Sequence, residues 1–163
     1  MSKEMLLTKK KLADFIKKSN DVTYFDPNIR LNNFKNISTD SRKISKGDIF
    51  IALDGENFEG HNFISEALRN GAEFCISTKR NSSTKQITVN STLDFIQHFA
   101  GYLIESTPKL KTFGITGTNG KTSTKEILKN IISKQFNVLA THGNLNNQIG
   151  LPLTIFNLTD MHE

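Results

Sequence analysis

Apolar positions in the first part of the chain follow helical spacing in some stretches and form short runs in others. Leu12, Phe15 and Ile16 lie on one face of a helix that Thr8 can cap. Gly71 stands where a left-handed residue commonly ends a helix. The expected elements are helices over 9–18, 63–70 and 92–106 and strands over 49–53, 74–77 and 87–89. Strands and helices in this order predict an α/β fold.

The second part of the chain has the pattern of a βαβ unit. Short apolar runs predict strands over 112–116 and 138–141. Between them, apolar residues at helical spacing predict a helix over 122–136, with Ile127 and Ile131 on its apolar face. We therefore expect two parallel strands joined by a helix.

A glycine-rich turn, within GITGTNGKTSTKE (114–126), leads from the first of these strands into the helix. Gly117 and Gly120 let the backbone approach a ligand closely, and the first amides of a helix have no partner inside it. Lys121 is placed to contact phosphate oxygens, and the Thr122 hydroxyl is placed to bind Mg²⁺. The turn therefore predicts a site for ATP and Mg²⁺, with a chance Gly/Thr turn as the alternative.

The spacing of this turn departs from the usual P-loop motif, which would have glycine at position 115, where the chain has Ile115. The amides, the lysine and the threonine that phosphate binding needs are nevertheless present. We expect a small N-terminal α/β domain over 1–85 and the incomplete start of a P-loop-type parallel-sheet domain over 86–163. The polar segment 79–85 is the expected loop near their boundary.

Two polar segments each allow two interpretations. The segment 141–152, THGNLNNQIGLP, follows an expected strand and is either a ligand-binding loop or an Asn-rich turn. The segment 38–48 contains Asp40, Ser41 and Arg42, which form either an anion or ribose pocket or a polar turn. Composition alone favours the turn in both cases.

Composition and charge narrow the classes of protein. The net charge of +5 suits anionic ligands, but the basic residues are scattered and no nucleic-acid motif is present, so we expect no nucleic-acid partner. No apolar run is long enough to insert in a membrane. The single Cys75 lies in an apolar run and is expected to be a buried thiol, which fits a cytoplasmic location. The four histidines have no metal-ligand spacing.

Three segments, in order, resemble the Mur ligases, which extend the peptidoglycan stem peptide. STDSRKISKGDIFIALDGENFEGHNFISEALRNGA (38–72) resembles their first domain, and GITGTNGKTSTKE resembles their ATP loop, including its altered spacing. THGNLNNQIGLPLTIFNL (141–158) is similar to the branch that adds D-Ala-D-Ala. A neighbouring branch, which adds one amino acid, usually has Thr-Thr at the position of Asn146 and Asn147.

The resemblance implies an ATP- and Mg²⁺-dependent ligase that joins D-Ala-D-Ala to UDP-MurNAc-tripeptide through an acyl phosphate. Lys121 and Thr122 would be the catalytic residues, with Thr122 also binding the metal. The ATP-binding residues would be Gly117, Thr118, Asn119, Gly120, Lys121, Thr122 and Ser123. The substrate-binding residues would be Asp40, Ser41, Arg42, Glu56, Asn57, Phe58, Asn146 and Asn147.

The resemblance also implies that most of the central domain and the whole C-terminal domain are absent, so we expect this chain alone not to ligate. The alternatives are a ligase of the amino-acid-adding branch, another P-loop nucleotide-binding module, or a regulatory fragment that binds only the nucleotide sugar.

Overall fold

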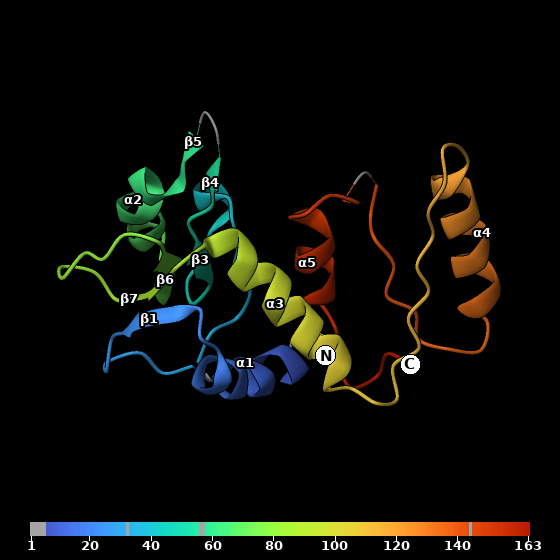
Figure 1. The fold of residues 1–163 in the computed structure, drawn as a ribbon, viewed down its shortest axis with the longest axis horizontal. Coiled ribbons are helices and arrows are strands. Elements are labelled where there is room, and N and C mark those ends of the chain that lie inside the picture. Colours follow the sequence, from blue (N-terminus) through green and yellow to red (C-terminus); the bar gives the residue numbers. More distant parts are fainter. Residues whose placement is uncertain (1–5, 32, 56–57, 144) are drawn as a thin grey trace.

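A five-stranded sheet forms the centre of the N-terminal unit in the computed structural model, which describes residues 6–31, 33–55, 58–143 and 145–163 (Figure 1). The strand order is β1 (Val22–Phe25), β7 (Gln86–Val89), β6 (Phe74–Ser77), β3 (Ile49–Ile51) and β2 (Ile37–Ser38). The pairs from β7 to β2 are parallel, and β1 is antiparallel to β7. The expected α/β fold is confirmed.

Helices cover both faces of this sheet. They are α1 (Leu6–Lys18) and α3 (Thr92–Glu105) on one face and α2 (Ile64–Arg69) on the other. Because successive strand residues point to opposite faces, Ile49 and Ile51 pack in the larger core with α1 and α3, while Phe50 packs with α2. Cys75 is buried on the α2 face, as expected, and burial raises the pKa of its thiol to about 12.

Gly71 ends α2 in the way the sequence predicts. Its φ is +105°, the Ala72 amide donates to the Ala67 carbonyl (3.0 Å), and the Gly71 amide donates to the Leu68 carbonyl (3.1 Å). These two bonds define a Schellman C-cap. A Cβ atom at position 71 would lie 2.9 Å from the Lys46 Cα, so both conformation and space require glycine here.

The N-terminal unit extends beyond the boundary that the sequence suggests at residue 85. β7 is hydrogen-bonded between β1 and β6, and α3 supplies much of the larger core. The division at residue 85 therefore separates elements that the structure pairs. The polar composition of the segment 79–85 suggested a boundary, but this segment connects two neighbouring strands of one sheet.

A helix from the end of the chain also packs on this unit. α5 (Gly150–Ile155) lies against α3, and Phe156, just after it, is buried with its ring centroid 5.2 Å from that of Phe99. The Thr8 hydroxyl donates to the Phe156 carbonyl over 2.7 Å. Residues near both ends of the chain therefore share one core.

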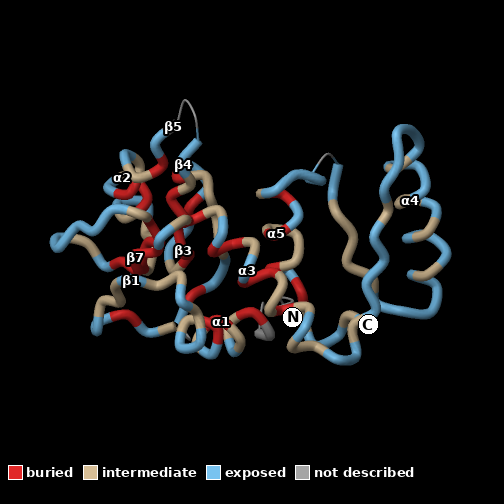
Figure 2. Tube along the Cα trace, viewed as in Figure 1, coloured by how far each residue is buried: buried red, intermediate tan, exposed pale blue. Residues whose placement is uncertain are grey.

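The segment around α4 (Lys121–Ile132) differs from the expected βαβ unit. The helix forms, but within the described part of the chain neither 112–116 nor 138–141 forms a strand. None of the α4 residues is fully buried, and Figure 2 shows this region mostly exposed. A strand requires a hydrogen-bonded neighbour, and these two segments have none among the described residues.

Two smaller features complete the described fold. β4 (Asp54–Gly55) and β5 (Phe58–Glu59) form a two-stranded antiparallel ribbon, and short 3₁₀ helices span Ser41–Lys43 and Gly60–Phe63. None of the described helices has the length and apolar character that a membrane crossing requires.

Candidate functional site

The turn before α4 has the backbone of a phosphate-binding loop. Gly117 and Gly120 have φ values of +149° and +76°, which favour glycine, and Gly120 is the N-cap of α4. The Thr124 amide donates to the Gly120 carbonyl, which is the first bond of the helix (2.9 Å). The amides of 121–123 precede that bond, so they are the ones that a helix start offers to an anion.

The side chains of this turn suit ATP and a metal. The Lys121 ammonium folds over the turn and donates to the Gly117 carbonyl (2.5 Å) and more weakly to the Thr118 carbonyl (3.4 Å). Thr122 and Ser123 are exposed at the helix start. The described residues contain no cluster of acidic, His or Cys side chains for a metal. Mg²⁺ held by one hydroxyl, phosphates and water still fits this donor set, because Mg²⁺ commonly keeps several waters.

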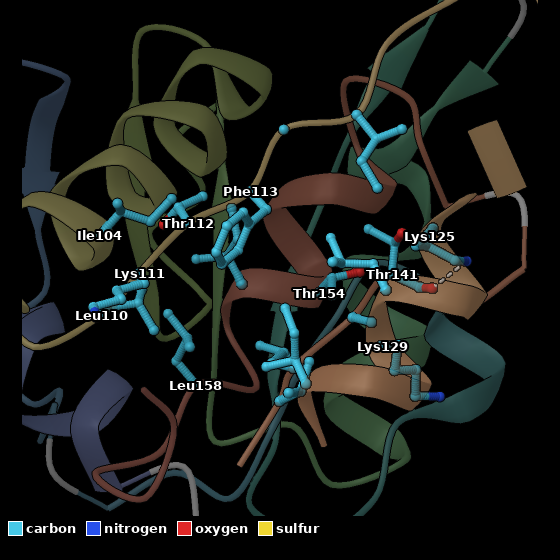
Figure 3. A pocket seen from close by; sticks show the side chains of 18 of the residues that line it. Ile104, Leu110, Lys111, Thr112, Phe113, Lys125, Lys129, Thr141, Thr154 and Leu158 are labelled. Carbon is cyan, nitrogen blue, oxygen red and sulfur yellow. Dashed lines mark hydrogen bonds between the residues drawn. The ribbon is translucent and has the colours of Figure 1, made fainter. Parts of the chain in front are cut away.

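Lys125 is a feature of this region that the sequence did not reveal. Its ammonium donates to the Thr141 carbonyl (2.6 Å) and pairs with Glu126 (3.1 Å), and its side chain is only 16% exposed (Figure 3). The hydrogen bond from Lys125 is the main reason that the pKa of Glu126 is lowered. Lys125 therefore ties α4 to the segment that leads towards Asn146 and Asn147.

An apolar cavity of about 300 Å³ lies beside α4. Its walls come from the chain around Phe113, from α4, from the segment 138–141 and from α5 (Figure 3). The lining does not include Gly117, Gly120, Lys121 or Thr122, so this cavity is distinct from the glycine-rich turn before α4.

Asp40, Ser41 and Arg42 follow β2 at the carboxyl edge of the sheet and are largely engaged with the protein itself. Asp40 accepts from the Arg42 amide (3.2 Å) and from its guanidinium (2.9 Å), and this side-chain bond is the main cause that lowers the pKa of Asp40 to about 2. Ser41 is buried and donates to Glu66 on α2 (2.9 Å). Arg42 remains exposed. A polar turn explains the first two residues, and Arg42 is the exposed residue of the three, although its guanidinium is paired with Asp40.

The second group of expected substrate residues spans 56–58. Glu56 and Asn57 lie outside the described residues, and Phe58 begins β5. Asp54 anchors the ribbon, because it accepts from the Gly60 amide (2.9 Å) and from the Thr78 hydroxyl (3.0 Å). The ribbon therefore follows β3 and is fixed to the chain after β6, at the same sheet edge as Asp40.

Asn146 and Asn147 differ from each other in their surroundings. The Asn147 side-chain oxygen accepts from the Ile149 amide (3.2 Å) and the Gly150 amide (2.7 Å), so it caps the start of α5. Asn146 is exposed. A structural role thus accounts for Asn147, whereas Asn146 can contact a ligand.

The candidate segments lie on one side of the molecule. Figure 1 shows the β4–β5 ribbon, the start of α5 and the turn before α4 along the upper side, with α5 between the other two. The structure therefore places the three segments on a common side of the molecule.

Two family models match the chain. The Mur ligase family, catalytic domain, matches residues 33–138, and the Mur ligase middle domain matches residues 115–163. The chain is 39% identical over 147 residues to the UDP-N-acetylmuramoyl-tripeptide–D-alanyl-D-alanine ligase of Synechocystis sp., an alignment that covers 87% of this chain and 31% of that protein.

The chain is also similar to solved structures of Mur ligases. A crystal structure of MurF from Acinetobacter baumannii matches with a TM-score of 0.79 and 36% identity, over 83% of this chain and 30% of that one. The MurF ligase of Thermotoga maritima in complex with ADP matches with a TM-score of 0.67 and 37% identity, over 78% and 30%. The chain thus spans less than a third of the length of these three proteins. The resemblance inferred from the sequence is confirmed, and the chain belongs to the Mur ligase family.

Proposed function

We propose that the chain supplies the nucleotide-sugar-binding unit and the ATP loop of a ligase that adds D-Ala-D-Ala to UDP-MurNAc-tripeptide. The observation that carries the proposal is the turn before α4, where two left-handed glycines, the free amides of 121–123 and Lys121 converge. The relatives named above are ligases of this kind, and one of them was solved with ADP.

The proposed reaction has two steps. The terminal carboxylate of the substrate attacks the γ-phosphorus of ATP, so that an acyl phosphate forms and ADP leaves. The amine of D-Ala-D-Ala then attacks the acyl carbon, an amide forms, phosphate leaves, and the amine proton passes to solvent. Such transfers depend mostly on positioning and charge neutralisation.

The residues of this chain would serve the first step. The amides of 121–123 bind phosphate oxygens, and the Lys121 ammonium exchanges its bonds to loop carbonyls for bonds to phosphate. The Thr122 hydroxyl is the ligand that this chain offers to Mg²⁺, which would neutralise phosphate charge. Arg42 and Asn146 are the exposed candidates for contact with the nucleotide sugar.

A domain division accompanies this proposal. We place the boundary near residue 110, because the sheet unit includes β7 and α3, and the middle-domain model begins at residue 115. α5 would then connect the two units by packing on α3. A nucleotide-linked substrate also agrees with the cytoplasmic location expected from the sequence.

Calorimetric titration of the purified chain tests the proposal. We expect Mg-ATP and UDP to bind, and Lys121→Ala to weaken ATP binding about tenfold to hundredfold, because one charge-assisted hydrogen bond contributes about 1.5–3 kcal/mol. Lys134→Ala is the matched control, since Lys134 is exposed and lies beyond α4. We expect this variant to bind ATP like the unchanged chain.

The outcomes separate the alternatives. Failure of both nucleotides to bind, in a chain whose circular dichroism shows it to be folded, would contradict the proposal for this polypeptide. UDP binding without ATP binding would favour a fragment that only holds the nucleotide sugar. Strongly salt-dependent binding of random RNA, without UDP binding, would favour another P-loop module.

A further inference from the structure

A polar pocket of about 370 Å³ lies at the carboxyl edge of β6, outside the residues assigned above. Its lining includes His61, Ser65, Lys79, Arg80 and Ser82. The pocket lies between the start of α2 and the connection from β6 to β7. Open α/β sheets commonly bind ligands at the carboxyl ends of their strands.

The connection that forms one wall is held in a fixed position. The Lys79 carbonyl accepts from the Ser77 hydroxyl (2.9 Å) and from the buried Gln86 side chain (3.0 Å). The Gln86 side chain also accepts from the Thr84 hydroxyl (2.8 Å). Two side chains on neighbouring strands therefore fix the backbone where the basic residues of the pocket begin.

Arg80 is a cation without a carboxylate partner in the described part of the chain. Its guanidinium carbon lies 3.9 Å from the ring centroid of Tyr24, which is a cation–π contact. No described Asp or Glu lies within ion-pair distance of it. Stacking fixes the plane of the guanidinium and leaves its N–H groups available, which is the geometry that binds phosphate well.

Lys79 adds a second donor, and its partners orient it. A lysine ammonium can only donate, so His61 Nε2, at 3.1 Å, accepts, and the ring proton of a neutral His61 lies on Nδ1. That buried Nδ1 has no hydrogen-bond partner, and Asp54 lies 3.6 Å away. Glu59 is 3.9 Å from Lys79 at an exposed position. His61 and Glu59 thus hold the Lys79 ammonium at the pocket, beside Arg80, which has no carboxylate partner among the described residues.

We propose that this pocket binds a phosphoryl group through Arg80 and Lys79. One source of this group is the diphosphate of the uridine nucleotide, because the pocket adjoins the β4–β5 ribbon through Asp54 and Thr78. This assignment rests on the function proposed above. The other source is free phosphate or pyrophosphate. The hydroxyls of Ser65 and Ser82 supply further donors of the type that phosphate oxygens accept.

Titrations of the full chain carrying Lys121→Ala test the proposal, because that change weakens phosphate binding at the turn before α4. We expect pyrophosphate and UDP to bind more tightly than uridine, and Arg80→Ala to weaken both at least about tenfold. Arg80→Lys keeps the charge and should retain part of the affinity. Arg30→Ala is the matched control, since Arg30 is exposed and does not line the pocket.

The outcomes also distinguish a nucleotide diphosphate from a free phosphate ion, and they separate this pocket from the proposed ATP site. UDP binding more tightly than pyrophosphate supports the nucleotide diphosphate, and equal binding supports a free phosphate ion. If neither anion binds, or if Arg80→Ala in a folded chain binds both as before, the proposal is overturned. ATP binding by the chain with Lys121 intact is measured separately, so either proposal can fail alone.

Discussion

Replacing Phe156 by alanine tests whether the end of the chain belongs to the core of the N-terminal unit. Phe156 is only 1% exposed, its ring lies 5.2 Å from that of Phe99, and its carbonyl accepts from buried Thr8. A buried Phe→Ala change costs about 3–5 kcal/mol, which includes about 0.5–1.5 kcal/mol for the lost ring pair. This is a large share of the roughly 5–15 kcal/mol that stabilises a typical domain.

Urea unfolding followed by circular dichroism measures this effect. At a slope of about 2 kcal/mol per molar urea, the midpoint should fall by about 1.5–2.5 M. Phe113→Ala is a matched control, because Phe113 is 62% exposed and its removal should change stability by no more than about 0.5 kcal/mol. If the two variants lost similar, small amounts of stability, Phe156 would not be packed on α3 in solution.

Three further predictions concern the cap, the charge pair and the exposed helix. In the same urea assay, Gly71→Ala should destabilise the chain by at least about 1–2 kcal/mol, because the φ of Gly71 is +105°. Gly101 lies in α3 with open space around it, so Gly101→Ala should be neutral or should stabilise the chain by up to about 1 kcal/mol. Arg42→Ala should raise the pKa of Asp40 from about 2 towards 3.8, which NMR titration can follow, and an unchanged titration would refute the pairing. Because the pKa of Asp40 is lowered in the fold, the pair stabilises the fold fully above pH 3.8, and this contribution is lost as the pH falls towards 2. Amides of α3 should exchange with deuterium far more slowly than those of α4, and equal protection would contradict the difference in burial between the two helices.

The elements predicted from local pattern are mostly those the structure contains. The helices α1, α2 and α3 and the strands β3, β6 and β7 fall close to the expected ranges, because their apolar residues already have the spacing of the faces they bury. Gly71 is predicted for the same reason, since a C-cap depends on the conformation of one residue. The turn before α4 also follows from its own residues, because its two glycines and the helix start are local features.

The extent of the N-terminal unit is not a local property. The polar segment 79–85 has the composition of a boundary, yet it joins two hydrogen-bonded strands, and only the pairing of β6 with β7 reveals this. The expected strands over 112–116 and 138–141 do not form, although their apolar pattern is suitable, because a strand also needs a hydrogen-bonded partner and the described residues provide none.

The sequence by itself determined the α/β class, the glycine-rich turn before a helix and the family, because each depends on residue types at short, fixed spacings. Only the tertiary structure decided that Asp40 and Ser41 are engaged with the fold, that Asn147 caps α5 and that Lys79 and Arg80 line one pocket. Those roles depend on partners that are fixed by folding, such as Glu66 for Ser41 and Tyr24 for Arg80. A residue's type shows which contacts it can make, and the packing of distant segments decides which of them it does make.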